Sequence, residues 1–401
     1  MTLDLLRALP QIQSGLSQLQ ASEAGRQERL AKGAELLALP EEELGGLGSR
    51  LRDGRYTWLP ALPMERMDSR HRAQAPAADY CAIGVDGSQI EVDRHAPFAC
   101  YLINLGSATI RYGVAPWAKL DGRPSLFAGE DAMAIGNPAN PLQATRLDSV
   151  LLAVRRSVAE IVHLAELAQA APGDATTLLL LDGGLILWPL GARGYDDYVR
   201  ELLLREGFLA ALSRLRPLVE TGRALVAGYI SRSDSTNVGH TLRLAACPYE
   251  RINCDHHCRQ RRPSERPCDS VGDLLDRDLL ARLLGPGERS ALFGSQSRVV
   301  QEWYGEHGIS FFYLHTGDEI ARVEVPDWLS QDAGRLDLLH GLILDQCRRG
   351  DGYPVALSEA HEMAVVHEAD RQQFWALVES LLSPVQSLSS AKAASKRRPA
   401  L

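Results

Sequence analysis

The sequence has no long hydrophobic run. No stretch of its 401 residues approaches about eighteen consecutive apolar residues, so we expect no membrane-spanning helix. The opening stretch MTLDLLRALPQIQ lacks the long apolar centre and the small-residue cleavage site of a signal peptide. With neither a span nor a targeting segment, a cytosolic location is the expectation.

An excess of positive charge is also missing. The chain has 43 Lys and Arg residues against 51 Asp and Glu residues, a formal net charge of −8. A protein that coats nucleic acid nonspecifically needs clustered Lys and Arg to release counterions, so this class is disfavoured. An enzyme with a local basic groove remains compatible with this charge. The length of 401 residues suggests one large domain or two moderate ones, and a hydrophobic share of 45% is enough for a sizeable core.

The paired CxxC spacing of common zinc sites is absent, although the sequence has seven cysteines. Four of them lie within 22 residues: Cys247, Cys254, Cys258 and Cys268. Clustered cysteines in a cytosolic protein favour a metal over disulfides, and four thiolates suit Zn²⁺ or an iron–sulfur cluster. His256 and His257 could replace one thiolate. The alternative is a loop that carries reduced thiols.

Composition divides the chain into three parts. Residues 1–75 are polar with leucines at roughly helical spacing, which predicts a helical N-terminal arm for dimer or partner contact, or a plain packing helix. Residues 76–385 would form the main domain, interrupted by a Cys-rich insertion at about 245–275. The small, polar and basic residues 386–401 predict a disordered tail.

The first half of the main domain is typical of short strands. The run CAIGVDGSQI is apolar up to Asp86, where Asp-Gly signals a turn. Residues 98–113 contain two β-rich stretches that Gly106 separates, which predicts an antiparallel meander. Scattered Pro and Gly predict a loop-rich segment at 116–141.

The rest of the main domain alternates helices and strands. We expect helices at 146–169 and 198–220, and between them a buried strand that ends at Asp182. ALVAGYISRS predicts another buried strand, ISFFYLHTG and ARVEVPDWL a late hairpin, and residues 330–348 and 354–382 closing helices. This order predicts an α/β core with a mixed sheet flanked by helices.

Two acidic residues occupy equivalent positions. Asp86 and Asp182 each follow a nearly uninterrupted apolar strand and precede a glycine, so both carboxylates would meet at the carboxyl edge of one sheet. Hard cations such as Mg²⁺ and Mn²⁺ prefer carboxylate oxygens, and a pair of such ions can cleave a phosphodiester. A third ligand should come from the intervening helix, on which Glu160 and Glu166 are the candidates. Either could instead face solvent.

Further candidates gather near the carboxyl end. The segment DGYPVALSEAHEMA places Tyr353, Glu359, His361 and Glu362 near a helix start, because Pro354 suits the first helical turn. His361 could be a metal ligand or a proton donor, or a surface residue of an amphipathic helix. Tyr353 and His361 would stand roughly 12 Å apart along the helix axis and serve different parts of a site.

Taken together, these segments resemble the NurA nuclease family. The matching pieces are VDGSQ at 85–89, LLLLDGGL at 178–185, AGYISRSDS at 227–235, ARVEVPDW at 321–328 and GYPVALSEAH at 352–361. Their order and spacing match across residues of about 80–375. The first and last pieces are the most specific.

The resemblance implies an RNase H-like core that acts on DNA ends with Mn²⁺ or Mg²⁺, as exonuclease and single-strand endonuclease. It also implies a homodimer that works with a HerA-type hexameric translocase in DNA end resection and double-strand break repair. By position, the acidic residues of the family fall on Asp86 and Asp182, and its Tyr and His on Tyr353 and His361. The family Glu falls on Glu160, with Glu166 as the rival.

Some features stand outside this resemblance. The Cys-rich insertion is a departure from the family pattern. Arg232, at a strand end beside serines, is a candidate for contacting the DNA backbone, and Arg259–Arg262 and Lys396–Arg398 are alternatives. Two other functions stay open: a catalytically silent subunit that binds DNA or the translocase, and a metal phosphatase for small phosphoesters.

Overall fold

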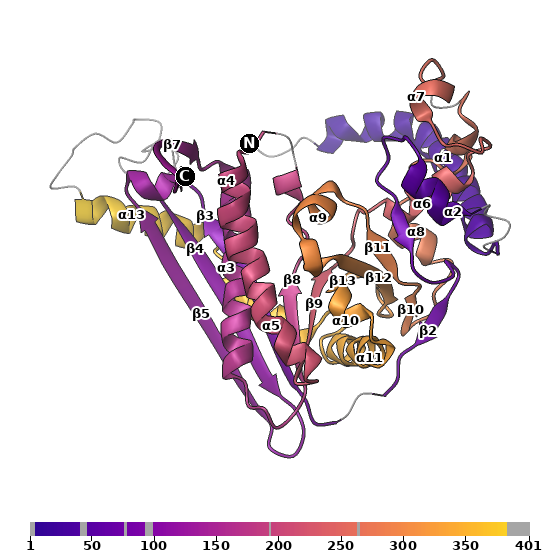
Figure 1. Ribbon diagram of the computed structural model, residues 1–401. Helices are drawn as coiled ribbons and strands as arrows, with labels where there is room; N and C mark the ends of the chain where they lie inside the picture. Colours follow the sequence, from indigo (N-terminus) through magenta and orange to yellow (C-terminus); the bar gives the residue numbers. More distant parts are fainter. Residues whose placement is uncertain are drawn as a thin grey trace. The chain divides into compact units, whose positions relative to one another are not determined.

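The computed structural model describes residues 5–40, 46–75, 78–92, 99–191, 194–262 and 265–382 (Figure 1). Its contacts divide the chain into two compact units. Unit 1 takes its residues from 1–72, 232–296 and 311–322, and unit 2 takes the remainder. Unit 1 thus includes most of the N-terminal segment and the Cys-rich segment, whereas the predicted tail 386–401 lies outside the described residues. Within the described ranges, no helix combines the length and apolar character needed to cross a membrane.

Unit 2 is built on a mixed sheet with the strand order β5-β4-β3-β8-β9. These strands are β3 (Cys81–Ile90), β4 (Cys100–Arg111), β5 (Trp117–Ala128), β8 (Thr177–Asp182) and β9 (Ala224–Ile230). The first three form the predicted antiparallel meander. Strand β8 runs parallel to both β3 and β9. The predicted α/β core with mixed pairing and the strand that ends at Asp182 are therefore confirmed.

Three local predictions in this meander are wrong. Strand β3 does not turn at Asp86 but continues to Ile90, because β4 pairs with every residue of it. Strand β4 is not broken at Gly106 and runs unbroken to Arg111. The segment expected to be loop-rich contains β5 and the two-stranded sheet of β6 (Ala134–Asn137) and β7 (Asn140–Arg146).

Helices cover both faces of this sheet. Side chains three residues apart on a strand point to opposite faces, and Gly84 of β3 faces one helix, α12, while Gly87 faces another, α3. Figure 1 shows α3 lying across β3, and α5 packs against α3 and β9. The helices of unit 2 are α3 (Ser149–Ala170), α4 (Asp197–Arg200), α5 (Ala210–Glu220), α9 (Arg298–Trp303), α10 (Asp327–Ser330), α11 (Ala333–Arg349), α12 (Val355–Ala364) and α13 (Glu368–Leu382).

Most predicted helices are confirmed, with local differences. Helix α3 begins after Asp148, whose carboxylate accepts a hydrogen bond from the backbone N–H of Leu151. The helix expected at 198–220 is one run from α4 to α5, but its middle, Glu201–Leu209, is a π-helix. The last predicted helix is two helices, α12 and α13, because the chain leaves the helical conformation at Val365.

Helix α12 lies unusually close to the sheet. A Cβ atom at Gly84 would overlap the backbone of Ala356, and one at Gly106 would overlap the carbonyl oxygen of Ala360. On the helix side, Ala356, Ala360 and Ala364 recur every four residues and are fully buried. Small residues on both partners therefore let the helix backbone contact the strands directly.

Polar side chains hold both ends of α12. At its start, the amide oxygen of buried Gln346 accepts a hydrogen bond of 3.1 Å from the N–H of Ala356. At its end, the amide of Asn104 on β4 donates to the carbonyl oxygens of Met363 and Ala364, at 3.0 and 2.8 Å. These bonds satisfy terminal backbone groups that a helix leaves unpaired, and they fix the helix along its axis.

Unit 1 has its own hydrophobic core. Leu30 and Leu37 of α1 pack there with Leu242, Leu279 and Phe311. The elements of unit 1 are α1 (Leu5–Leu37), α2 (Leu47–Asp53), β1 (Ala61–Pro63), β2 (Arg70–Arg72), α6 (Asn237–Ala245), α7 (Cys254–His257), the 3-10 helix η5 (Pro267–Val271), α8 (Asp276–Leu280), β10 (Glu288–Ser290) and β11 (Phe293–Ser295). The predicted late hairpin, β12 (Ile309–His315) and β13 (Ile320–Pro326), is confirmed, and the two units divide its strands.

The close contact under α12 yields a stability prediction. In Gly106→Ala, the new methyl group must displace the helix backbone, so we expect the free energy of unfolding to fall by about 1–3 kcal/mol. The matched control is Gly136→Ala in β6, where a new Cβ would meet no atom within 4 Å. Urea unfolding of both variants measures the difference. Equal stability of the two would contradict direct contact between α12 and β4.

Candidate functional site

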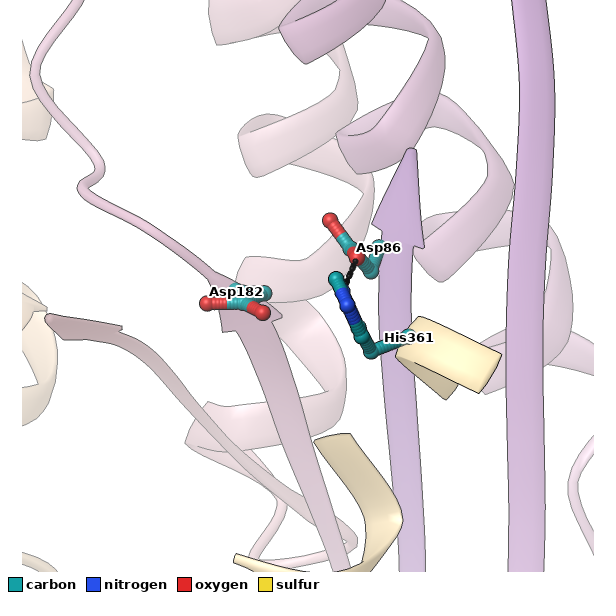
Figure 2. A group of neighbouring side chains, drawn as sticks. All are labelled: Asp86, Asp182 and His361. Carbon is teal, nitrogen blue, oxygen red and sulfur yellow. Dashed lines mark hydrogen bonds and ion pairs between the residues drawn. The ribbon is translucent and has the colours of Figure 1, made fainter. Parts of the chain in front are cut away.

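Asp86 and Asp182 lie side by side on neighbouring parallel strands (Figure 2). The last residue pair of β3 and β8 joins Val85 and Leu181, and the next residue on each strand is an aspartate. Both carboxylates therefore lie on the same face of the sheet, at the point where β8 ends. The predicted meeting of the two carboxylates is confirmed, although Asp86 reaches this point from within a strand.

His361 approaches the two aspartates from α12. Its Nδ1 lies 2.8 Å from Oδ2 of Asp86, and one ligand atom from each of Asp86, Asp182 and His361 lies within 4.8 Å of the other two. Half of the His361 side chain is exposed (54%), so the group opens to solvent. Residue Gly106, which α12 crosses, is the direct partner of Asp86 in β4, so the close helix packing delivers His361 to Asp86.

The donor set suits a divalent cation. Two carboxylates and one imidazole are ligands that Mg²⁺ and Mn²⁺ accept, and an open side of the site leaves room for water or substrate. Three ligand atoms of Asp, Glu, His or Cys side chains must lie close together to share one ion. Among the described residues, this group is the one that meets the condition.

Tyr353 supports the second aspartate. Its side chain makes a hydrogen bond to Asp182, and its ring packs edge-on against Tyr229 of β9 at 5.4 Å between centroids. Burial raises the pKa of Asp182, the charge of Asp86 raises it further, and the bond from Tyr353 opposes this rise. Tyr353 thus bonds to Asp182 from just before α12, whereas His361, on that helix, bonds to Asp86.

Glu160 reaches the site from α3. Its side chain is buried (5% exposed), and a Cβ atom at Gly87 would meet its carboxylate. Burial raises the pKa of Glu160 to about 7, and the charges of Asp86 and Asp182 contribute to the rise. Its Oε1 is a buried polar atom without a hydrogen-bond partner, although the Nε of Arg156 lies 3.3 Å away. A buried carboxylate oxygen that lacks a partner is suited to a cation.

Glu166 does not approach the aspartates in the same way. Its side chain is half exposed and pairs with Arg123 at 3.3 Å and with the ring of His163 at 3.6 Å. Glu359 and Glu362 lie on α12 but do not belong to the group of close ligand atoms that Asp86, Asp182 and His361 form. Glu160 also lies outside this group of three, but the charges of Asp86 and Asp182 both act on its carboxyl group.

Two residues of this region were missed from the sequence. Arg156 lies one helical turn before Glu160, and its guanidinium donates a 2.8 Å hydrogen bond to the carbonyl oxygen of Gly87. Glu324, fully buried on β13, accepts a 2.7 Å hydrogen bond from the N–H of Leu185 and so fixes the Gly-Gly loop after Asp182. The i, i+4 spacing of Arg156 and Glu160 was the available signal.

The other predicted site residues belong to unit 1. Arg232 lies there, with its backbone N–H bonded to the carboxylate of Glu319 at 3.0 Å. The four clustered cysteines also belong to unit 1 and are free thiols: Cys247, Cys254, Cys258 and Cys268.

Comparison with known proteins agrees with this geometry. The model of the NurA domain matches residues 82–366, which is more than half of the chain and contains every residue of the acidic site. No curated protein matches the sequence. By this match the chain belongs to the NurA family, a family of nucleases that process DNA.

Proposed function

We propose that this chain is a deoxyribonuclease that depends on Mn²⁺ or Mg²⁺ and hydrolyses phosphodiester bonds at the site around Asp86. The observation that carries this proposal is the convergence of Asp86, Asp182 and His361 at an open edge of the sheet. Burial of Glu160 beside them supports a fourth acidic contribution. Family membership supports DNA as the substrate.

Each residue would have a distinct role. Asp86 and Asp182 would bind the ion directly, and Glu160 would complete its shell from the α3 side. The bound ion would lower the pKa of a water molecule and stabilise charge on the leaving oxygen. Tyr353 would hold Asp182 in place and orient water or substrate.

His361 has two roles open to it. With Nδ1 bonded to Asp86, its other ring nitrogen, Nε2, is left for a second ligand. A neutral ring would bind a second metal ion through Nε2, and a charged ring would donate a proton to the leaving oxygen. Asp86 orients the ring in both cases.

We further propose that unit 2 is RNase H-like. Support comes from its strand order, in which an antiparallel meander is extended by two parallel strands, and from acidic residues on the two adjacent strands β3 and β8. On this proposal, exonuclease and single-strand endonuclease activities would share one site. Arg232 would contact the DNA backbone.

We also propose that the protein forms a homodimer and works with a HerA-type hexameric translocase in DNA end resection and double-strand break repair. Two exposed surfaces support a protein partner. In unit 2, β5 is exposed along its length except at Phe127, and among the described strands it pairs only with β4. In unit 1, the first turns of α1 expose apolar side chains: Leu5, Leu6, Leu9, Ile12 and Leu16.

Removing one ligand tests the site. Asp86→Asn keeps the shape of the side chain but removes its charge, so we expect cleavage to fall by more than ~100-fold, beyond the usual loss for a supporting residue. The measurement is cleavage of end-labelled linear DNA with Mn²⁺, Mg²⁺ or EDTA. Asp174→Asn, at an exposed side chain outside the site and outside β5, is the matched control and should cleave normally.

Two outcomes would count against the proposal. Wild-type activity in Asp86→Asn would place the reaction elsewhere. A wild-type protein that cleaves with neither metal would instead be a catalytically silent subunit that binds DNA or the translocase. Far-UV circular dichroism of each variant excludes loss of fold as the cause.

The raised pKa of Glu160 predicts how stability depends on pH without metal. Below pH 4.5 the carboxyl group is protonated in both the folded and the unfolded chain, so Glu160 does not lower the free energy of unfolding. Between pH 4.5 and about 7 the Glu160 carboxyl ionises readily only in the unfolded chain, so the folded protein loses stability as the pH rises. Above pH 7 the carboxyl is ionised in both states and this loss of stability has reached its full size. Glu160→Gln should therefore stabilise the protein at pH 8 by roughly 1–3 kcal/mol, and not at pH 4.5.

Urea unfolding in EDTA at both pH values measures this effect. Glu166→Gln is the control on the same helix and should leave stability unchanged, because Glu166 is half exposed. Adding Mn²⁺ at pH 8 should reverse the order and make the wild type the more stable protein. A Glu160→Gln variant that is less stable at pH 8 in EDTA would refute the burial of an unsatisfied charge.

A further inference from the structure

Four cysteines of unit 1 lie on short turns between α6 and α8. Cys247 follows the end of α6, Cys254 begins α7, and Cys268 lies in η5. The N–H of Cys258 donates a 2.9 Å hydrogen bond to the carbonyl oxygen of Cys254, so these two are one helical turn apart. All four are free thiols, and no disulfide joins them.

The four sulfurs gather in one place. The charges of the other three thiolates act on Cys254, and those of Cys258 and Cys268 act on Cys247. Burial raises the pKa of both Cys247 and Cys254, and the neighbouring thiols raise it further. Cys258 and Cys268 are buried at 8% and 7% exposure.

Ordinary core packing does not explain this gathering. The remaining cysteines occur singly, within strands or a helix: Cys81, Cys100 and Cys347. Between Cys247 and Cys268, by contrast, Ile252 is the one described residue other than cysteine that adds an apolar side chain to the core. A segment with so little apolar surface gains its fixed shape from another source, and a bound metal is such a source.

The spacing of the sulfurs favours a cluster over a single ion. Zinc bound to four thiolates at about 2.3 Å holds each pair of sulfurs roughly 4 Å apart. No three of the four cysteine sulfurs lie within 4.8 Å of one another. Among the described residues, only the ligand atoms of the acidic site are that close. A polynuclear iron–sulfur cluster spreads its four thiolates further apart.

Neighbouring groups suit a negatively charged cluster. Arg50 donates hydrogen bonds to the carbonyl oxygens of Cys247 and Tyr249, at 2.7 and 3.2 Å, and its charge acts on the Cys247 thiol. The charge of Arg266 acts on Cys254 in the same sense. The ring of His257 stacks flat on Tyr249, with 3.9 Å between the ring centroids.

We propose that an iron–sulfur cluster, which fixes this segment of unit 1, is ligated by Cys247, Cys254, Cys258 and Cys268. The cluster has a structural role in this proposal, which involves no electron transfer. It stands independently of the proposed nuclease activity, because the cluster is detected by its own composition and absorption.

The test is the composition of the full-length protein purified without oxygen. We expect iron and acid-labile sulfide in equal amounts, and a visible absorption band that bleaches with dithionite. Cys258→Ala should lower bound iron at least ~10-fold, whereas Cys100→Ala, at another buried cysteine, should retain it. Reconstitution of metal-free wild-type protein with iron and sulfide should raise its melting temperature and restore the band.

Each other outcome overturns a defined part of the proposal. Zinc at one ion per chain without sulfide would refute the cluster and leave a four-thiolate zinc site. Wild-type protein without iron or zinc, and without uptake on reconstitution, would refute the metal site altogether. Because both of these measurements use the wild-type protein, the test holds even if the Cys258→Ala variant fails to fold.

Discussion

The acidic site depends on the parallel register of β3 and β8. Val85 pairs with Leu181, so the next residues, Asp86 and Asp182, stand together on one face of the sheet. A shift of one residue would move one of the two carboxylates to the opposite face. Fully buried leucine and valine neighbours below this point hold the register, and the hydrophobic core therefore sets the geometry of a polar site.

This arrangement brings like charges together under partial burial, and the surroundings offset the repulsion unequally. Asp86 has the ring of His361, and Asp182 has the hydrogen bond of Tyr353. Glu160 has Arg156 nearby, but one of its buried oxygens makes no hydrogen bond. Without a cation the site is therefore a source of instability within a well-packed sheet, a pattern typical of functional sites.

Local apolar runs made β8 and α3 predictable, since each forms its pattern within the segment itself. The Asp-Gly dipeptide after Val85 indicates a turn that does not form, because the following strand β4 pairs with β3 on both sides of Asp86. Gly106 suggested a break in the strand, but a glycine is needed there because the backbone of α12, which is distant in the sequence, contacts it directly. The two aspartates followed from the residue pattern. The segment near the carboxyl end also made Tyr353 and His361 candidates, together with Glu359 and Glu362, and the family resemblance selected the first two.

The two proposed metal sites would not compete for the same ions. The site of unit 2 offers carboxylates and an imidazole, which Mn²⁺ and Mg²⁺ accept, and that of unit 1 offers four thiolates, which select iron–sulfur clusters or Zn²⁺. A chain with both donor sets can thus keep an exchangeable ion at the exposed edge of one sheet and a permanent group in a segment poor in apolar residues. The difference in ligand softness would thus decide which metal each site binds.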